Sequence, residues 1–339
     1  MLPCLRVLAF PCLVAAAFGC SASSKAAPIA EGTPTNDTWA DGKHIAASVT
    51  IPFGSSVTIA PGAKISFAPG VTVTVQGTLK GGSRAAHAKL GGTPWSGLVV
   101  VTGGALELEG TDIGAADTAI TVQGGTASFS YGTIDTSGPF EVDKSGELTV
   151  AHATVTGSTK ATAVIGKFTA TFLDYDAAVY EGIVGQDDGA VISIEDSKLH
   201  GTGNENNDLV AARGAGTVHV AYTDFSQAHC GFHFDAVTSF DIAHVSIHDG
   251  SYGFMLYGSS ATAGTRTVSA SNIFNNHQRG AEEETATTVN GLITISDGYW
   301  ANNGASLDDN LRQFSGQVHV TNMSTAAPVA GTGPRAAVP

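Results

Sequence analysis

Apolar residues recur along this chain in one short pattern that repeats ten times between Leu106 and Thr325. Each copy has an apolar residue, a second two positions later and a third five positions after that. Successive copies begin 20 to 28 residues apart, which is enough for one supersecondary unit and too little for a domain. The ten copies are Leu106/Leu108/Ile113, Ala127/Phe129/Ile134, Leu148/Val150/Val155, Phe168/Ala170/Tyr175, Ile192/Ile194/Leu199, Val218/Val220/Phe225, Phe240/Ile242/Ile247, Val268/Ala270/Asn275, Ile293/Ile295/Trp300 and Val318/Val320/Thr325.

The spacing of these residues predicts short strands joined by bends. The first two residues of each copy share one face of a strand, because side chains alternate with period two. The odd gap to the third residue requires a bend that keeps the same face inside. A further apolar pair, such as Ile120 and Val122, usually lies six to nine residues before the next copy. Three strands per turn and no amphipathic helical stretch predict an all-β parallel β-helix of about ten to twelve turns.

The remaining segments divide the chain into five parts. Residues 1–19 are expected to be a signal peptide, and residues 20–44, rich in Ser, Ala and Pro, a flexible tether. Alternating apolar residues broken by Pro-Gly turns predict an N-terminal β-rich cap with the first turns at 45–97. The β-helix follows at 98–325, and residues 326–339 are expected to be a disordered tail.

The signal sequence ends in a segment, Ala17 to Cys20, that resembles the lipobox of bacterial lipoproteins. The resemblance implies cleavage before Cys20 and attachment of lipid to that cysteine. Ser21 then implies sorting to the outer membrane. The alternative is ordinary cleavage near Ala22 and release of a secreted protein.

Composition limits the classes of partner and of chemistry. A net charge of -14 without clusters of Lys or Arg excludes nucleic acid as the main partner. After removal of the signal only Cys20 and Cys230 remain, so a disulfide framework is excluded. Cys230 has only His229 and His233 near it in sequence and is interpreted as a small buried apolar residue. No metal site and no cofactor are predicted, although calcium could bind the acidic surface.

The run from Cys230 to Ser260 and the Thr- and Val-rich run from Val49 to Ser83 resemble the right-handed parallel β-helix family, which includes pectate-lyase-like enzymes. The resemblance covers about residues 45–325. It implies a right-handed coil but no single activity, because lyases, hydrolases, epimerases and adhesins share the fold. The Gly-His-Gly and Arg-x-Lys motifs of polygalacturonase-type members are absent from the sequence. The arginines that a pectate-lyase-type site would need have no matching motif.

Two sets of polar residues are candidates for a functional surface. Equivalent positions at a bend place Asp196, Tyr222 and His244 in one row, which suits either a structural ladder or a carbohydrate-stacking strip. On the third strands, burial of Phe232 and Phe234 would turn His233 and Asp235 outward. The other members expected on that face are Asp208, His229, Tyr252 and Tyr257.

Three functions remain open. The first is a lipid-anchored, non-enzymatic envelope protein that displays a surface for glycan or protein binding, with the membrane as its partner through the lipid. The second is a polysaccharide lyase, epimerase or hydrolase that uses His233, Asp235 and His244 near residues 229–257. The third is a structural spacer. The long insertions 201–208 and 258–266 flank the candidate turn, and Asn275 at a core position of a neighbouring turn marks it as irregular.

Overall fold

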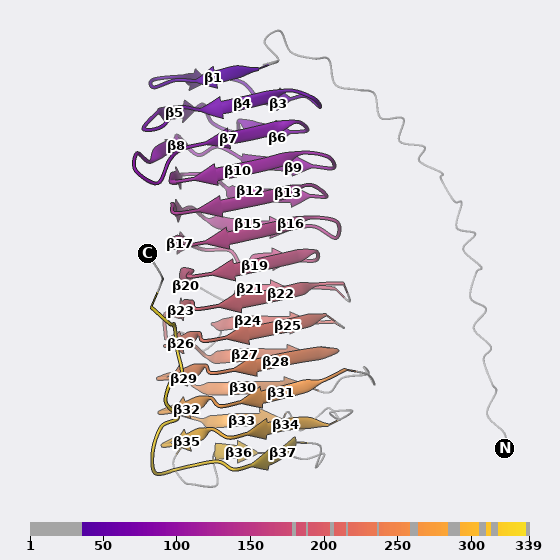
Figure 1. Cartoon of the computed structure of the whole chain (residues 1–339), viewed down its shortest axis with the longest axis vertical. Coiled ribbons are helices and arrows are strands. Elements are labelled where there is room, and N and C mark those ends of the chain that lie inside the picture. The colour runs from indigo at the N-terminus through magenta and orange to yellow at the C-terminus, as the bar shows by residue number, and fades with distance from the viewer. Residues whose placement is uncertain are drawn as a thin grey trace, which may run out of the picture. The chain divides into compact units, whose positions relative to one another are not determined.

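The computed structural model describes residues 36–177, 181–187, 189–203, 207–214, 216–235, 237–257, 264–283, 292–304, 310–312 and 318–336. Within these ranges the regular elements are strands, arranged in three parallel sheets of 13, 12 and 12 members. Each strand pairs with the equivalent strand of the next turn, so that the three sheets run the length of the stack (Figure 1). The predicted all-β parallel β-helix is confirmed, with a number of turns close to that expected.

Sheet A contains β1 (Asp37–Trp39), β4 (Ser56–Ile59), β7 (Thr78–Gly81), β10 (Ala105–Glu109), β13 (Thr126–Ser130), β16 (Glu147–Ala151), β19 (Lys167–Thr171), β22 (Val191–Glu195), β25 (Thr217–Ala221), β28 (Ser239–Ala243), β31 (Arg266–Ser269), β34 (Ile293–Ser296) and β37 (Val318–Thr321). Sheet B contains β2 (His44–Ile45), β5 (Lys64–Phe67), β8 (Ala88–Gly92), β11 (Thr111–Gly114), β14 (Thr133–Asp135), β17 (Thr154–Ser158), β20 (Asp174–Ala177), β23 (Lys198–His200), β26 (Asp224–Ser226), β29 (Ser246–His248), β32 (Asn272–Phe274) and β35 (Tyr299–Ala301). Sheet C contains β3 (Val49–Ile51), β6 (Thr72–Val75), β9 (Gly97–Val101), β12 (Thr118–Gln123), β15 (Gly138–Val142), β18 (Thr162–Val164), β21 (Glu181–Gly185), β24 (Asp208–Arg213), β27 (Cys230–Asp235), β30 (Tyr252–Tyr257), β33 (Arg279–Glu283) and β36 (Leu311–Arg312).

The repeated apolar pattern maps directly onto this architecture. Leu106 and Leu108 lie in β10 of sheet A, and Ile113 lies in β11 of sheet B, past the bend. Ile120 in β12 supplies the third wall. All four side chains are at most 1% exposed and belong to one continuous core that runs through the stack. The core is stabilised because each turn covers the apolar edge of the turn before it.

In most turns the bend between sheets A and B is made by one residue whose backbone has the left-handed conformation, with positive φ. Tyr131, His152 and Phe172 occupy this position with φ of 54°, 51° and 52°. Their rings stack with centroids 4.6 Å apart in both successive pairs. The polar and aromatic row predicted from sequence is therefore a ladder of bend residues, spaced by the distance between turns.

The N-terminal boundaries differ from those expected. β1 begins at Asp37, inside the predicted tether, because Trp39 is buried in the core at 1% exposure and β1 pairs with β4. The predicted cap at 45–97 is not a separate module. Its strands β3 and β6 pair in register with each other and then with β9, as downstream turns do. Residues 45–97 are ordinary turns of the β-helix.

The turn that begins near Arg266 also differs. The predicted core residues were Val268, Ala270 and Asn275, but Phe240 pairs with Arg266 and Ile242 pairs with Val268. Arg266 thus takes the first core position, and Ile273 takes the third, fully buried. The prediction was wrong by two positions because an apolar pattern cannot identify a buried arginine as a core residue.

The C-terminal segment is ordered against the turns over residues 325–336, here called the C-terminal strap. It runs back past β32, β29, β26 and β23, as the yellow trace in Figure 1 shows. The side-chain amide of Asn272 donates from Nδ2 to the carbonyl of Val329 and accepts at Oδ1 from the backbone N–H of Val329. The backbone N–H of Gly333 donates to the carbonyl of His244. The prediction of a disordered tail was therefore wrong for the described residues, because the strap satisfies polar groups of the bends.

Candidate functional site

The predicted third-strand face centres on Asp208, which begins β24 and is 6% exposed. Its Oδ2 lies 2.6 Å from Nδ1 of His233, and its Oδ1 lies 3.2 Å from Nδ1 of His229. Cys230 pairs with Asp208 across the sheet, and its Sγ lies 3.3 Å from Nδ1 of His229. Desolvation alone would raise the pKa of Asp208, but the two histidines outweigh it and lower the pKa to about 2.

A glycine allows this cluster to assemble. A Cβ atom on Gly231 would lie 2.6 Å from Cγ2 of Ile247, so that position faces the core. The next residue, Phe232, is also fully buried. Gly231 and Phe232 therefore both face the core. The residues before and after them, Cys230 and His233, can then both point toward Asp208 on the outer side of the sheet.

Aromatic rings from the next turn cover the cluster. Tyr257 stacks on His233 with ring centroids 4.7 Å apart, and Tyr252 meets His229 edge to face at 5.3 Å. Asp235 is exposed and pairs with Tyr257 along the sheet. The structure therefore brings together five of the predicted residues of this face, with Asp235 at its edge.

His244 does not join them. It lies at the bend between β28 and β29, with φ of 56°, whereas His233 and Asp235 lie on β27 in sheet C. Its ring stacks on Tyr222 at 4.7 Å, and its buried Nδ1 has no hydrogen-bond partner among the residues that the structure describes. The structure does not bring the predicted catalytic residues His233, Asp235 and His244 together, because His244 lies at the bend from sheet A to sheet B and the other two lie on sheet C.

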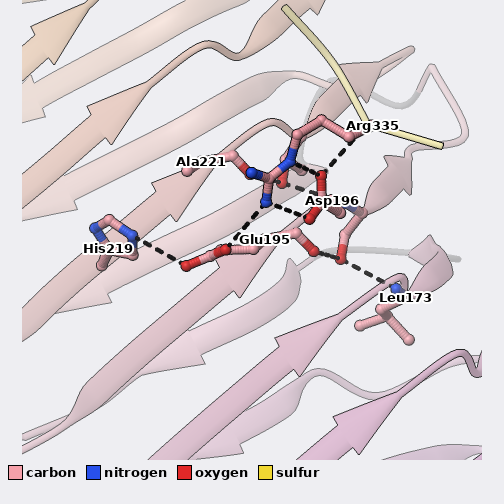
Figure 2. Close-up of polar contacts among 8 residues, drawn as sticks. Leu173, Glu195, Asp196, His219, Ala221 and Arg335 are labelled. Carbon is pink, nitrogen blue, oxygen red and sulfur yellow. Dashed lines mark hydrogen bonds and ion pairs between the residues drawn. The ribbon is translucent and has the colours of Figure 1, made fainter. Parts of the chain in front are cut away.

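The row of Asp196, Tyr222 and His244 is covered by the C-terminal strap. Arg335 donates from Nε and Nη2 to the two carboxylate oxygens of Asp196 at 2.7 and 2.6 Å (Figure 2). Its guanidinium lies 3.9 Å above the ring of Tyr222. The hydrogen bond from Arg335 lowers the pKa of Asp196 despite partial desolvation. A ligand could reach Asp196 and Tyr222 only by displacing Arg335.

A ligand-sized hollow occurs elsewhere, on the outer face of sheet B. This sheet B cleft has a volume of about 380 Å³ and lies over β5, β8, β11 and β14. Gly91 and Gly114 occupy neighbouring outward positions and leave its floor without side chains. Its polar walls come from Lys64, Lys89, Asp112, Thr133 and Asp135.

The charged side chains of the sheet B cleft differ in their hydrogen bonding and exposure. Asp112 accepts hydrogen bonds from His87 at 3.1 Å and from the hydroxyl of Thr133 at 2.9 Å. Desolvation would raise the pKa of Asp112, but these hydrogen bonds outweigh it and leave the pKa below its usual value. Lys64 and Lys89 lie side by side in register, and both are exposed.

The sequence did not reveal the sheet B cleft, Cys230 as a polar partner, or the role of Arg335. The signal for the cleft was present, since Gly91 and Gly114 each lie two positions after a charged outward residue, Lys89 or Asp112. A search for missing side chains on the outer face would have found it. The binding of Arg335 to Asp196 joins residues 139 positions apart and has no local signal.

Comparison of the chain with protein-family models, curated proteins and solved structures finds no match. In the part of the chain described above, no helix is long and apolar enough to span a membrane. The predicted signal peptide and the predicted lipid-attachment residue Cys20 lie outside the described residues.

Proposed function

We propose that this protein is a lipid-anchored, non-enzymatic β-helix of the cell envelope that binds an acidic glycan in the sheet B cleft. The observation that carries the proposal is the cleft itself. Its volume of about 380 Å³ falls within the roughly 300–1,000 Å³ typical of ligand sites. It is formed by a regular, stacked sheet, so its walls are held in place before the ligand arrives.

The chemistry of the cleft favours a sugar that carries carboxylates. Lys64 and Lys89 point from neighbouring strands, which are about 4.8 Å apart, so one carboxylate can contact both ammonium groups. Among the described residues neither lysine takes part in an ion pair. The carboxylates of Asp112 and Asp135 balance these two charges within the cleft, so the lysine end is the part that a sugar carboxylate would contact.

The floor and the far wall suit the rest of a sugar ring. The floor is the backbone of Gly91 and Gly114, whose Cα atoms can meet the C–H face of a ring, because Leu90 and Ile113 point into the core at 1% exposure. Asp135 and Thr133 on the next strand supply acceptors and a hydroxyl for ring hydroxyl groups. A flat ring can lie on this floor because Gly91 and Gly114 have no side chains.

Isothermal titration with short oligogalacturonates, with malto-oligosaccharides as the neutral probe, tests the proposal. Lys89→Ala should weaken binding of the acidic probe about tenfold or more, as expected for loss of a charged hydrogen bond. Lys167→Ala, an exposed lysine on β19 of sheet A, is the matched control and should not change the affinity. Equal binding of the neutral probe, or equal weakening in both variants, would argue against the cleft.

The enzymatic alternative is tested on the same probes. Release of product, lost in His233→Ala while the fold is kept, would establish a lyase, epimerase or hydrolase instead of a binding protein. If neither binding nor product release is observed, the result would favour a structural spacer.

The lipid anchor has a separate test. Mass spectrometry of the mature protein should find Cys20 as an acylated N-terminus, and Cys20→Ala should move the protein from the membrane fraction to the soluble fraction. An unmodified terminus beyond Cys20 would show a secreted protein.

A further inference from the structure

The cluster at the start of β24 and β27 contains oxygen, nitrogen and sulfur atoms in one place. One carboxylate oxygen of Asp208, Sγ of Cys230 and one ring nitrogen of His233 all lie within 4.8 Å of one another. Asp208 is 6% exposed and Cys230 is fully buried. The side chain of His233 is 18% exposed, so the cluster borders solvent on that side.

We propose that Asp208, Cys230 and His233 bind a divalent transition metal ion of the zinc class. Thiolate, imidazole and carboxylate together suit zinc and its neighbours, whereas calcium and magnesium prefer oxygen ligands alone. The site lies on sheet C, so it does not depend on the glycan proposal for sheet B.

The distances fit a site that opens slightly when an ion enters. Ligand atoms about 2.0 to 2.3 Å from a tetrahedral zinc ion lie roughly 3.3 to 3.7 Å from one another. Asp208 and His233 are 2.6 Å apart and share a hydrogen bond. An ion that replaces this bridging proton would increase the distance between the two atoms by about 1 Å, and rotation of the side chains can supply that change.

Two neighbours support the proposed ligands. His229 lies 3.2 Å from the second oxygen of Asp208 and orients the carboxylate, as residues next to metal ligands commonly do. Tyr257 stacks on His233 and fixes its ring. His229 is therefore a positioning residue in this proposal and not a ligand.

The position of the cysteine agrees with this geometry. Cys230 pairs with Asp208 across the sheet, and its side chain is fully buried beside the carboxylate. An ion bound there would displace the proton of the thiol.

The test uses the full chain, stripped of metal and titrated with Co²⁺ as a spectroscopic substitute for Zn²⁺. One equivalent should bind and produce a thiolate-to-cobalt charge-transfer band. Cys230→Ser should abolish that band, and His233→Gln should weaken binding at least tenfold. His219→Gln, a surface histidine on β25, is the matched control and should bind like the wild type.

The proposal is overturned if no Co²⁺ binds, or if binding lacks the charge-transfer band and is the same in Cys230→Ser. X-ray absorption of the zinc-loaded wild type keeps the test decisive if a variant does not fold. It should show one sulfur at about 2.3 Å and lighter ligands at about 2.0 to 2.1 Å. A spectrum with nitrogen and oxygen only would refute the assignment.

Discussion

Removal of the His248 side chain should make the stability of this protein less dependent on pH. Nε2 of His248 lies 3.2 Å from Asp224, and Nδ1 lies 2.8 Å from Asp249. The hydrogen bond with Asp224 is the largest cause that raises the pKa of His248 to about 9, against partial desolvation. Because the folded value is above the unfolded value of about 6.5, protonation of His248 stabilises the folded state.

The size and the pH window follow from that shift. A rise of about 2.5 units corresponds to roughly 3.4 kcal/mol as an upper bound, at about 1.36 kcal/mol per unit. Asp249 is 54% exposed and solvent screens its charge, so about 1–2 kcal/mol is the expected effect. This stabilisation is fully present below about pH 6.5 and is lost as the pH rises through about 9.

The assay is urea unfolding of wild type and His248→Gln at pH 6 and at pH 10. The variant should be less stable by about 1–2 kcal/mol at pH 6, and the difference should nearly vanish at pH 10. Asp224→Asn should remove much of the same pH dependence, because it takes away the principal partner. A stability difference that is equal at both pH values would contradict an electrostatic role for His248 and assign its effect to stacking on Phe274, whose ring centroid lies 5.0 Å away.

Two further predictions concern the core and the strap. Phe232→Ala should lower the free energy of unfolding by about 3–5 kcal/mol in urea melts, because Phe232 is fully buried between Phe225 and Phe254. A loss below about 1 kcal/mol would show that the neighbouring turns close the cavity. Arg335→Ala should expose the C-terminal strap, so limited proteolysis should remove it several-fold faster while the core remains intact. Unchanged cleavage would mean that the contacts of Asn272 hold the strap without Arg335.

The fold could be predicted from the sequence because the apolar pattern and the register of the sheets both result from burying one face of every strand in each stacked turn. Leu106 and Leu108 must share a face, and each turn must stack on the next, so period and spacing together indicate parallel strands. The outward positions of His233 and Tyr257 followed from the same alternation. The pattern failed at Arg266, where a charged residue takes a core position that alternation reserves for an apolar side chain.

Sites that depend on contacts between distant residues could not be predicted in the same way. Arg335 reaches Asp196 only because the strap turns back along the stack, and nothing near either residue indicates that path. The convergence of Asp208 with Cys230 depends on Gly231 facing the core, which interrupts regular alternation. The sheet B cleft arises where side chains are missing, whereas motif analysis looks for residues that are present.

The most direct test of the proposed function is to fill the sheet B cleft without disturbing the sheet. A Cβ on Gly114 would meet no atom of the described residues within 4 Å, and φ at Gly114 is not positive. Gly114→Leu should therefore fold normally and occupy the floor. Thr169→Leu on the outer face of sheet A is the control. Gly114→Leu should keep the wild-type melting temperature and lose oligogalacturonate binding in titration calorimetry, while Thr169→Leu should retain binding. Undiminished affinity in a folded Gly114→Leu protein would contradict the assignment of the cleft as the binding site.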